Sequence, residues 1–148
     1  MKRRLGIAAA LAALSTCFLV APAAPAGGVP AKLLGTWTRT ITASDWKKAG
    51  YGTNVTGLFT MTVKPNGHFA VNVPRNTAFS TGVPWQVSFS ARADGQMTVG
   101  PMGECVSDGF LDAGAYRWKV AGRTLTITKV RDKCAFEVRW FVGSWKRK

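Results

Sequence analysis

The chain has 148 residues, 47% of them hydrophobic, so it is long enough and apolar enough to bury a core as one ordinary domain. Twenty Lys and Arg against seven Asp and Glu give a formal charge of +13, which favours anionic partners such as polymers, lipid head groups or acidic proteins. The single histidine, His68, excludes a zinc site built from several histidines.

Residues 1–26 have the pattern of a removable export signal. A basic start, Lys2-Arg3-Arg4, is followed by an apolar run from Leu5 to Ala21 and by a small-x-small cleavage site, Ala24-Pro25-Ala26. We therefore expect cleavage near Ala26 and a secreted or extracytoplasmic protein without a transmembrane helix in the mature chain. Removal of the signal takes away three cations and no acid, which leaves a charge of +10.

The three cysteines divide between the signal and the domain expected over residues 27–148. Leu14-Ser15-Thr16-Cys17 partly resembles a bacterial lipid-attachment motif, so an anchor at Cys17 is the alternative to cleavage. Otherwise Cys105 and Cys134 are the mature pair, and an oxidising compartment predicts a disulfide between them. The closed loop of about 30 residues corresponds to roughly 3–4 kcal/mol on the chain-entropy model.

After a short linker, apolar and polar residues alternate with a period of two in eight successive segments, which is typical of half-buried strands. The residues on the apolar side are, in chain order, Trp37 and Ile41; Phe59, Met61 and Val63; Phe69, Val71 and Val73; Trp85, Val87 and Phe89; Met97 and Val99; Tyr116, Trp118 and Val120; Leu125 and Ile127; and Phe136, Val138, Trp140 and Val142.

Turn residues separate these segments at Lys64–Gly67, Arg92–Gly95 and Ala121–Arg123. One segment, 44–50, is predicted to be helical, with Ser44 or Asp45 capping its start. Eight short strands with tight turns predict an all-β, antiparallel, up-and-down barrel with one short helix. Closure would bury the apolar sides and remove the edge strands, and an open two-sheet sandwich is the alternative.

Gly35-Thr36-Trp37, preceded by Leu33-Leu34, opens the first strand. With the helical segment after it, the meander, the segment Tyr116–Val130 and the ending Val142–Arg147, the chain resembles a lipocalin-like (calycin-type) domain of small exported bacterial proteins. The resemblance implies a closed barrel with one open mouth and a small apolar ligand. It also implies that Trp37, held by Gly35 at the strand start, plugs the closed end under a basic residue of the last strand, Lys146 or Arg147.

The predicted interior is rich in aromatic residues, which suits either an apolar ligand pocket or a packed core, and we favour the packed core. Arg39 shares the register of Trp37 and Ile41 and so points inward, where a guanidinium needs a partner. That partner is a bound carboxylate, an acid at the barrel mouth, or solvent if a bulge turns Arg39 outward. The candidate ligand-binding residues are Arg39, Trp85, Tyr116, Trp118 and Trp140.

The longest irregular segment, 100–114, contains Glu104, Asp108 and Asp112 beside Cys105. Grouped carboxylates can bind calcium or act as acid and base, but their order does not match a calcium loop. We interpret the segment as a solvated loop that the disulfide ties to Cys134.

Catalysis has little support, because the sequence has no Gly-x-Ser-x-Gly motif, no phosphate loop and no free mature thiol. We expect a non-enzymatic, monomeric protein without cofactor or metal that binds a small apolar or amphipathic ligand with a carboxylate. The alternative is a protein whose basic surface binds an anionic cell-wall polymer or an acidic protein. Basic residues with aromatics between them suit nucleic acid as well, but an exported protein rarely meets it, and we expect no nucleic-acid partner.

Overall fold

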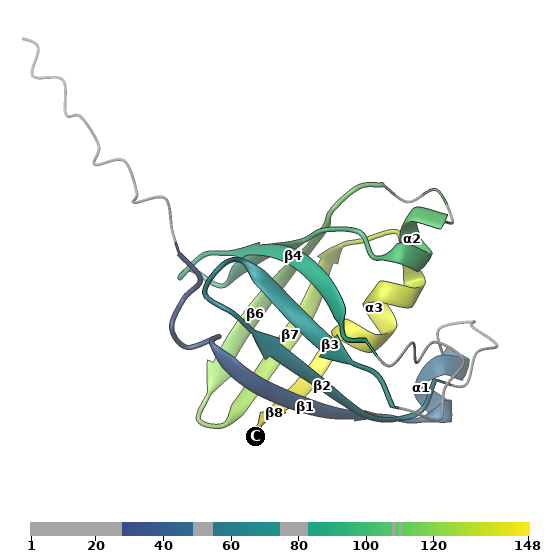
Figure 1. The fold of residues 1–148 in the computed structure, drawn as a ribbon, viewed down its shortest axis with the longest axis horizontal. Helices are drawn as coiled ribbons and strands as arrows, with labels where there is room; N and C mark the ends of the chain where they lie inside the picture. The colour runs from purple at the N-terminus through teal and green to yellow at the C-terminus, as the bar shows by residue number, and fades with distance from the viewer. Residues whose placement is uncertain (1–27, 49–54, 75–82, 108, 110) are drawn as a thin grey trace, which may run out of the picture.

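The computed structural model describes residues 28–48, 55–74, 83–107, 109 and 111–148. In this part of the chain eight strands form one closed antiparallel barrel in which each strand pairs with the next in sequence and the last pairs with the first (Figure 1). The predicted up-and-down barrel is confirmed. The strands are β1 (Gly35–Ile41), β2 (Gly57–Val63), β3 (His68–Asn72), β4 (Trp85–Ala91), β5 (Gln96–Val99), β6 (Gly114–Ala121), β7 (Thr124–Arg131) and β8 (Gly143–Arg147).

The alternation of apolar and polar residues determines which side of each strand faces the core. On β4, for example, Val87, Phe89 and Ala91 are buried while the residues between them are exposed. The three hairpin turns predicted from sequence join β2 to β3, β4 to β5 and β6 to β7. At the last of these, Gly122 has φ +55°, a conformation that glycine adopts without the strain of a Cβ.

Three helices lie at one end of the barrel, and the hairpin turns lie at the other (Figure 1). They are α1 (Ala43–Lys48), α2 (Gly103–Ser107) and α3 (Ala135–Phe141). The predicted short helix is α1. The residue that caps its start is Thr42, and not Ser44 or Asp45 as predicted, although Asp45 bonds back to Thr42. The backbone N–H of Thr42 donates to Asp45 Oδ2 at 2.9 Å, and the N–H of Asp45 donates to Thr42 Oγ1 at 3.3 Å.

Helix α3 corrects the last predicted strand. Phe136, Val138, Trp140 and Val142 alternate like a strand, but Phe136, Glu137, Trp140 and Phe141 are the residues that α3 buries. This is the spacing of one helix face, and a run of seven residues satisfies both periods. The closing strand β8 begins only at Gly143, whose φ is +137°.

The end of the barrel opposite the helices is closed by Trp37, which is fully buried. Its indole N–H donates to the carbonyl of Leu33 at 2.8 Å. Of the two basic candidates, Arg147 lies across Trp37, with its guanidinium carbon 4.2 Å from the ring centroid. Lys146 is exposed and donates instead to Thr124 Oγ1 at 2.8 Å.

The helical end is filled by side chains of α3. The Phe141 ring stacks on Phe69 of β3 with centroids 5.5 Å apart and meets Tyr116 of β6 edge-on at 4.9 Å. Strands β3 and β6 are three positions apart in the eight-stranded order, so this ring bridges opposite walls. Trp140 packs beside it, 5.2 Å away. Helix α3 therefore occupies the barrel mouth that a ligand would have to enter.

The predicted export signal, its cleavage point and Cys17 lie outside the described residues. Among the helices that the structure describes, none is long and apolar enough to cross a membrane.

Candidate functional site

The predicted ligand-binding aromatics form part of the packed interior. Tyr116, Trp118 and Trp140 are buried, and Trp85 is partly buried with its ring 6.3 Å from that of Trp140. The indole N–H of Trp118 donates to the carbonyl of Gln96 at 3.2 Å. The indole nitrogen of Trp140, in contrast, is buried and has no hydrogen-bond partner among the described residues.

Arg39 is half-buried at the helical end, where it binds the end of α3. Its Nη1 donates to the carbonyl of Trp140 at 3.0 Å, to that of Arg139 at 3.4 Å and, in a shorter contact, to that of Val142. These carbonyls are the ones that a helix leaves without intrahelical partners. Burial lowers the pKa of Arg39, and the nearby carboxylate of Asp45 opposes that shift.

The partners that the structure shows for Arg39 are thus backbone carbonyls of α3, and a bound carboxylate or an acid at the barrel mouth stays a prediction. Of the acids in that segment, Asp112 is exposed, Asp108 lies outside the described residues, and the side chain of Glu104 is not described. The structure does not bring Arg39 together with Asp112.

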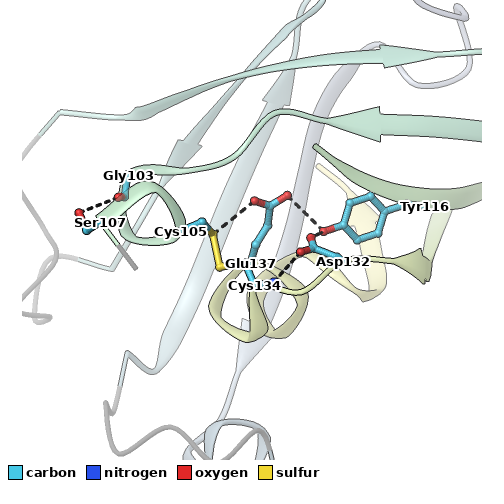
Figure 2. Close-up of a disulfide and its surroundings, with 7 residues drawn as sticks. All are labelled: Gly103, Cys105, Ser107, Tyr116, Asp132, Cys134 and Glu137. Atoms are coloured by element: carbon cyan, nitrogen blue, oxygen red, sulfur yellow. Dashed lines mark hydrogen bonds between the residues drawn. A yellow bond between two sulfur atoms is a disulfide. The ribbon is translucent and has the colours of Figure 1, made fainter. Parts of the chain in front are cut away.

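A buried polar cluster lies beside the disulfide, between α3 and β6 (Figure 2). The phenolic oxygen of Tyr116 is hydrogen-bonded to Glu137 Oε1 at 3.1 Å, and the hydroxyl also binds Asp132 Oδ2 in a shorter contact. Asp132 Oδ1 accepts the backbone N–H of Cys134 at 2.7 Å. Glu137 is 1% exposed and is the one acidic or basic residue in the buried core of the described chain.

The electrostatics of this cluster follow from its burial. Burial, and then the charge of Asp132, raise the pKa of Glu137 to about 8, against the hydrogen bonds from Tyr116 and from the backbone of Met102. Burial, followed by the charge of Glu137, also raises the pKa of Tyr116. Both groups are therefore shifted toward their protonated forms.

The predicted disulfide is present beside this cluster. Cys105 on α2 and Cys134 at the start of α3 are bonded with their Cα atoms 5.6 Å apart, within the usual range for a disulfide. Both cysteines are buried, and Sγ of Cys105 lies 3.6 Å from Glu137 Oε2. The bond ties the 100–114 segment to Cys134, as predicted, but part of that segment forms the helix α2 rather than an irregular solvated loop, and Met102 and Cys105 are buried.

The outer side of the barrel carries a row of exposed cations on neighbouring strands. On β6, Arg117 lies opposite Thr128 of β7, and Lys119 lies opposite Thr126. Among the described residues the one ion pair is Arg92–Asp94, so none of these cations is neutralised by a carboxylate. We name Arg117 and Lys119 the basic strip. Further exposed cations lie on the neighbouring segments, at Lys129, Arg131, Lys133 and Lys146.

Two open hollows adjoin the basic strip. One, of about 330 Å³, is lined by Arg117, Lys119, Thr126 and Thr128, together with Asp94, Gly95 and Trp118. The other, of about 300 Å³, lies over β4, β5 and β6 and is also lined by Arg117. Cationic and hydroxyl donors on one outer surface can bind repeated anionic groups. Within the described residues no group of His, Cys, Asp and Glu side chains is arranged to hold a metal ion.

Comparisons with family models, curated proteins and solved structures each return no match to this chain. The lipocalin resemblance therefore stays a prediction from the residues, and the function has to be argued from the geometry.

Sequence reasoning did not single out Asp132 or Glu137. The strand pattern places Glu137 on the outer side, and only the helical spacing of 136, 137, 140 and 141 places it inside. Asp132 offers a weak signal, since a short acid two residues before Cys134 can cap a backbone N–H. Nothing in the sequence pairs either acid with Tyr116.

Proposed function

We propose that this protein is a non-enzymatic binding protein that holds an anionic polymer along the basic strip. The observation that carries the proposal is the row of exposed cations on β6, β7 and β8 that lacks carboxylate partners. A surface of this kind attracts a polyanion at long range and binds it more weakly as salt increases. The formal charge, +13 for the full chain and +10 after removal of the expected signal, adds to that attraction.

The arrangement of donors on the strip suits an extended chain rather than a single small anion. Arg117 and Lys119 are two residues apart on the same strand, and side chains at that spacing project from the same side of a strand. The hydroxyls of Thr126 and Thr128 lie opposite them. Repeated phosphate or carboxylate groups can therefore meet one cation and one hydroxyl at successive positions.

The packing of the interior supports the outer surface over the barrel mouth as the binding region. Phe141 and Trp140 of α3 occupy the space between β3 and β6, where the family resemblance implies a ligand. A small apolar ligand would have to displace α3 from these contacts before it could enter. The surface, in contrast, is available without rearrangement.

A binding titration with inorganic polyphosphate tests the proposal, with poly-L-glutamate as the carboxylate probe. The variant Arg117→Gln/Lys119→Gln should bind about tenfold more weakly or worse, because each lost charged contact contributes on the order of 1 kcal/mol. The matched control Lys47→Gln/Lys64→Gln removes two exposed charges away from β6 and β7 and should bind nearly as the wild type does.

Equal loss in both double variants would show a nonspecific effect of net charge and would contradict a site on the strip. Tighter binding of single-stranded DNA than of either polymer would overturn the assignment of the polymer class. Binding that does not weaken between low and high salt would also contradict it.

A small amphipathic ligand inside the barrel is the second candidate, and one observation favours it. The buried indole N–H of Trp140 has no acceptor among the described residues, and an orphaned donor in a core calls for a partner. A bound carboxylate or carbonyl could supply that acceptor once α3 has shifted. Displacement of a fluorescent fatty acid by unlabelled fatty acid tests this candidate directly, and no saturable binding would eliminate it.

A further inference from the structure

A continuous chain of hydrogen bonds links α3 to the residue that follows β7 (Figure 2). It runs from Glu137 Oε1 to the phenolic oxygen of Tyr116 at 3.1 Å, from there to Asp132 Oδ2, and from Asp132 Oδ1 to the N–H of Cys134 at 2.7 Å. Two carboxyl groups therefore share one phenol. Every link in the chain has to be supplied with a proton.

The phenol of Tyr116 alone cannot provide the proton for both of its hydrogen bonds to carboxyl groups. Tyr116 has one hydroxyl proton, which can be donated fully to one carboxylate but not to two. If the proton of Tyr116 goes to Asp132, the contact with Glu137 is a hydrogen bond only when Glu137 is itself the donor. If Glu137 is neutral, every hydrogen bond in the series has a donor. The acid O–H of Glu137 donates to the phenol of Tyr116, the phenol O–H donates to Asp132, and the backbone N–H of Cys134 donates to Asp132.

Within the described part of the chain, no cation beside Glu137 balances a second negative charge. Tyr116 faces it from β6, and Asp132 faces it from the segment between β7 and α3. The disulfide faces it from α2, and the backbone N–H of Met102 faces it from the residue before α2. The basic neighbours of Asp132 in sequence, Arg131 and Lys133, are exposed, and neither forms an ion pair with it. An ionised Glu137 would therefore be a buried, unpaired charge.

We propose that Glu137 is held as a neutral carboxylic acid whose proton latches α3 across the barrel mouth, and that loss of this proton releases α3. Glu137 lies in the first turn of α3, and Trp140 and Phe141, one turn later, fill the mouth. The disulfide keeps the start of α3 attached to α2 when the rest of the helix moves. The latch does not depend on polymer binding at the basic strip.

Carboxyl-carbon NMR on the whole chain tests the latch, because the sequence contains only two glutamates, Glu104 and Glu137. With ¹³C-labelled glutamate, the side-chain carboxyl signal of Glu137 should titrate with a midpoint near 8. Glu104→Gln should remove the other glutamate signal and keep this one. The backbone amides of α3 should shift or broaden with the same midpoint as the Glu137 signal.

Two results would overturn the latch. If both carboxyls titrate near pH 4–5, Glu137 is not held as the acid. If Glu137 titrates near 8 while the α3 amides stay unchanged, its proton does not hold the helix. Glu137→Gln, which keeps a donor toward Tyr116, should abolish the α3 transition. Should that variant not fold, the assignment by Glu104→Gln still decides the question.

Discussion

The guanidinium of Arg147 lies over the indole of Trp37, and the two residues are also register partners in the ladder that closes the barrel. Arg147 donates in addition to the carbonyls of Leu34 at 2.9 Å and Lys32 at 2.7 Å. One side chain of the last strand thus holds the first strand, the turn before it and the plug together. Only an arginine can stack on a ring and bind two carbonyls with separate nitrogens.

Replacing Arg147 by Ala should therefore lower the free energy of unfolding by about 2–4 kcal/mol, the sum of a lost cation–π contact and lost charged hydrogen bonds. Its exposed neighbour Lys146, replaced by Ala, should change stability by about 0.5 kcal/mol or less. Urea denaturation of the two variants measures the difference. Equal effects would show that the stack over Trp37 does not stabilise the closure.

Arg39→Met should destabilise the protein even though it removes a half-buried charge. The carbonyls of Arg139, Trp140 and Val142 would lose their shared donor, at a cost of about 1–3 kcal/mol. Arg39→Lys should recover part of the loss, because an ammonium can still donate to carbonyls. If the Met variant melts at the wild-type temperature, the guanidinium does not hold the end of α3.

Removal of the disulfide by Cys105→Ser/Cys134→Ser should lower the free energy of unfolding by about 2–5 kcal/mol. The loss should be greatest at α2 and α3, which the bond joins. Amide hydrogen exchange followed by mass spectrometry can locate it. Uniform loss of protection across the barrel, with none extra at these helices, would contradict a local role for the bond.

The stability of the wild type should fall as pH rises from about 5 to about 8 and then level off. The pKa of Glu137 is about 8 in the folded protein against an ordinary 4.5, so the folded state binds the extra proton throughout this interval. Each unit of rising pH in this interval then lowers the free energy of unfolding by about 1.4 kcal/mol at most. Urea titrations at a series of pH values should show this decline in the wild type and not in Glu137→Gln.

Asp45 provides the opposite control for the pH dependence. Hydrogen bonds from the backbone and side chain of Thr42 lower its pKa, so its contribution is lost as pH falls below about 4. Asp45→Asn should therefore change the acid limb of the profile and leave the decline between pH 5 and 8 intact. A change in the alkaline limb would show that the two groups are coupled.

The strands, their hairpins and the disulfide could be predicted from the sequence because each depends on a local pattern. Val87, Phe89 and Ala91 alternate with polar residues wherever the strand lies, and Cys105 has one partner in the described chain. Trp37 follows the same logic at the start of β1. For these features, the spacing of the residues along the chain is enough to predict which side chains are buried or bonded.

Helix α3 and its polar contacts could not be predicted in this way. Seven residues fit a strand and a helix equally well, and the choice is made by Phe69 and Tyr116, which α3 meets from strands far away in sequence. Whether Glu137 is a surface acid or a buried one depends on that choice. The partner of Arg39 likewise exists only because α3 ends beside β1.

The ladder between β1 and β8 has only two register pairs, Trp37 with Arg147 and Thr38 with Lys146, fewer than the other seams of the barrel. If β8 then also separates from β7, β1 and β7 become free edges that fit a β8 strand. A second molecule carries that strand behind its own α3, beyond the point where Cys134 is tethered. Partial unfolding therefore favours a strand-exchanged dimer, in which each copy completes the barrel of the other.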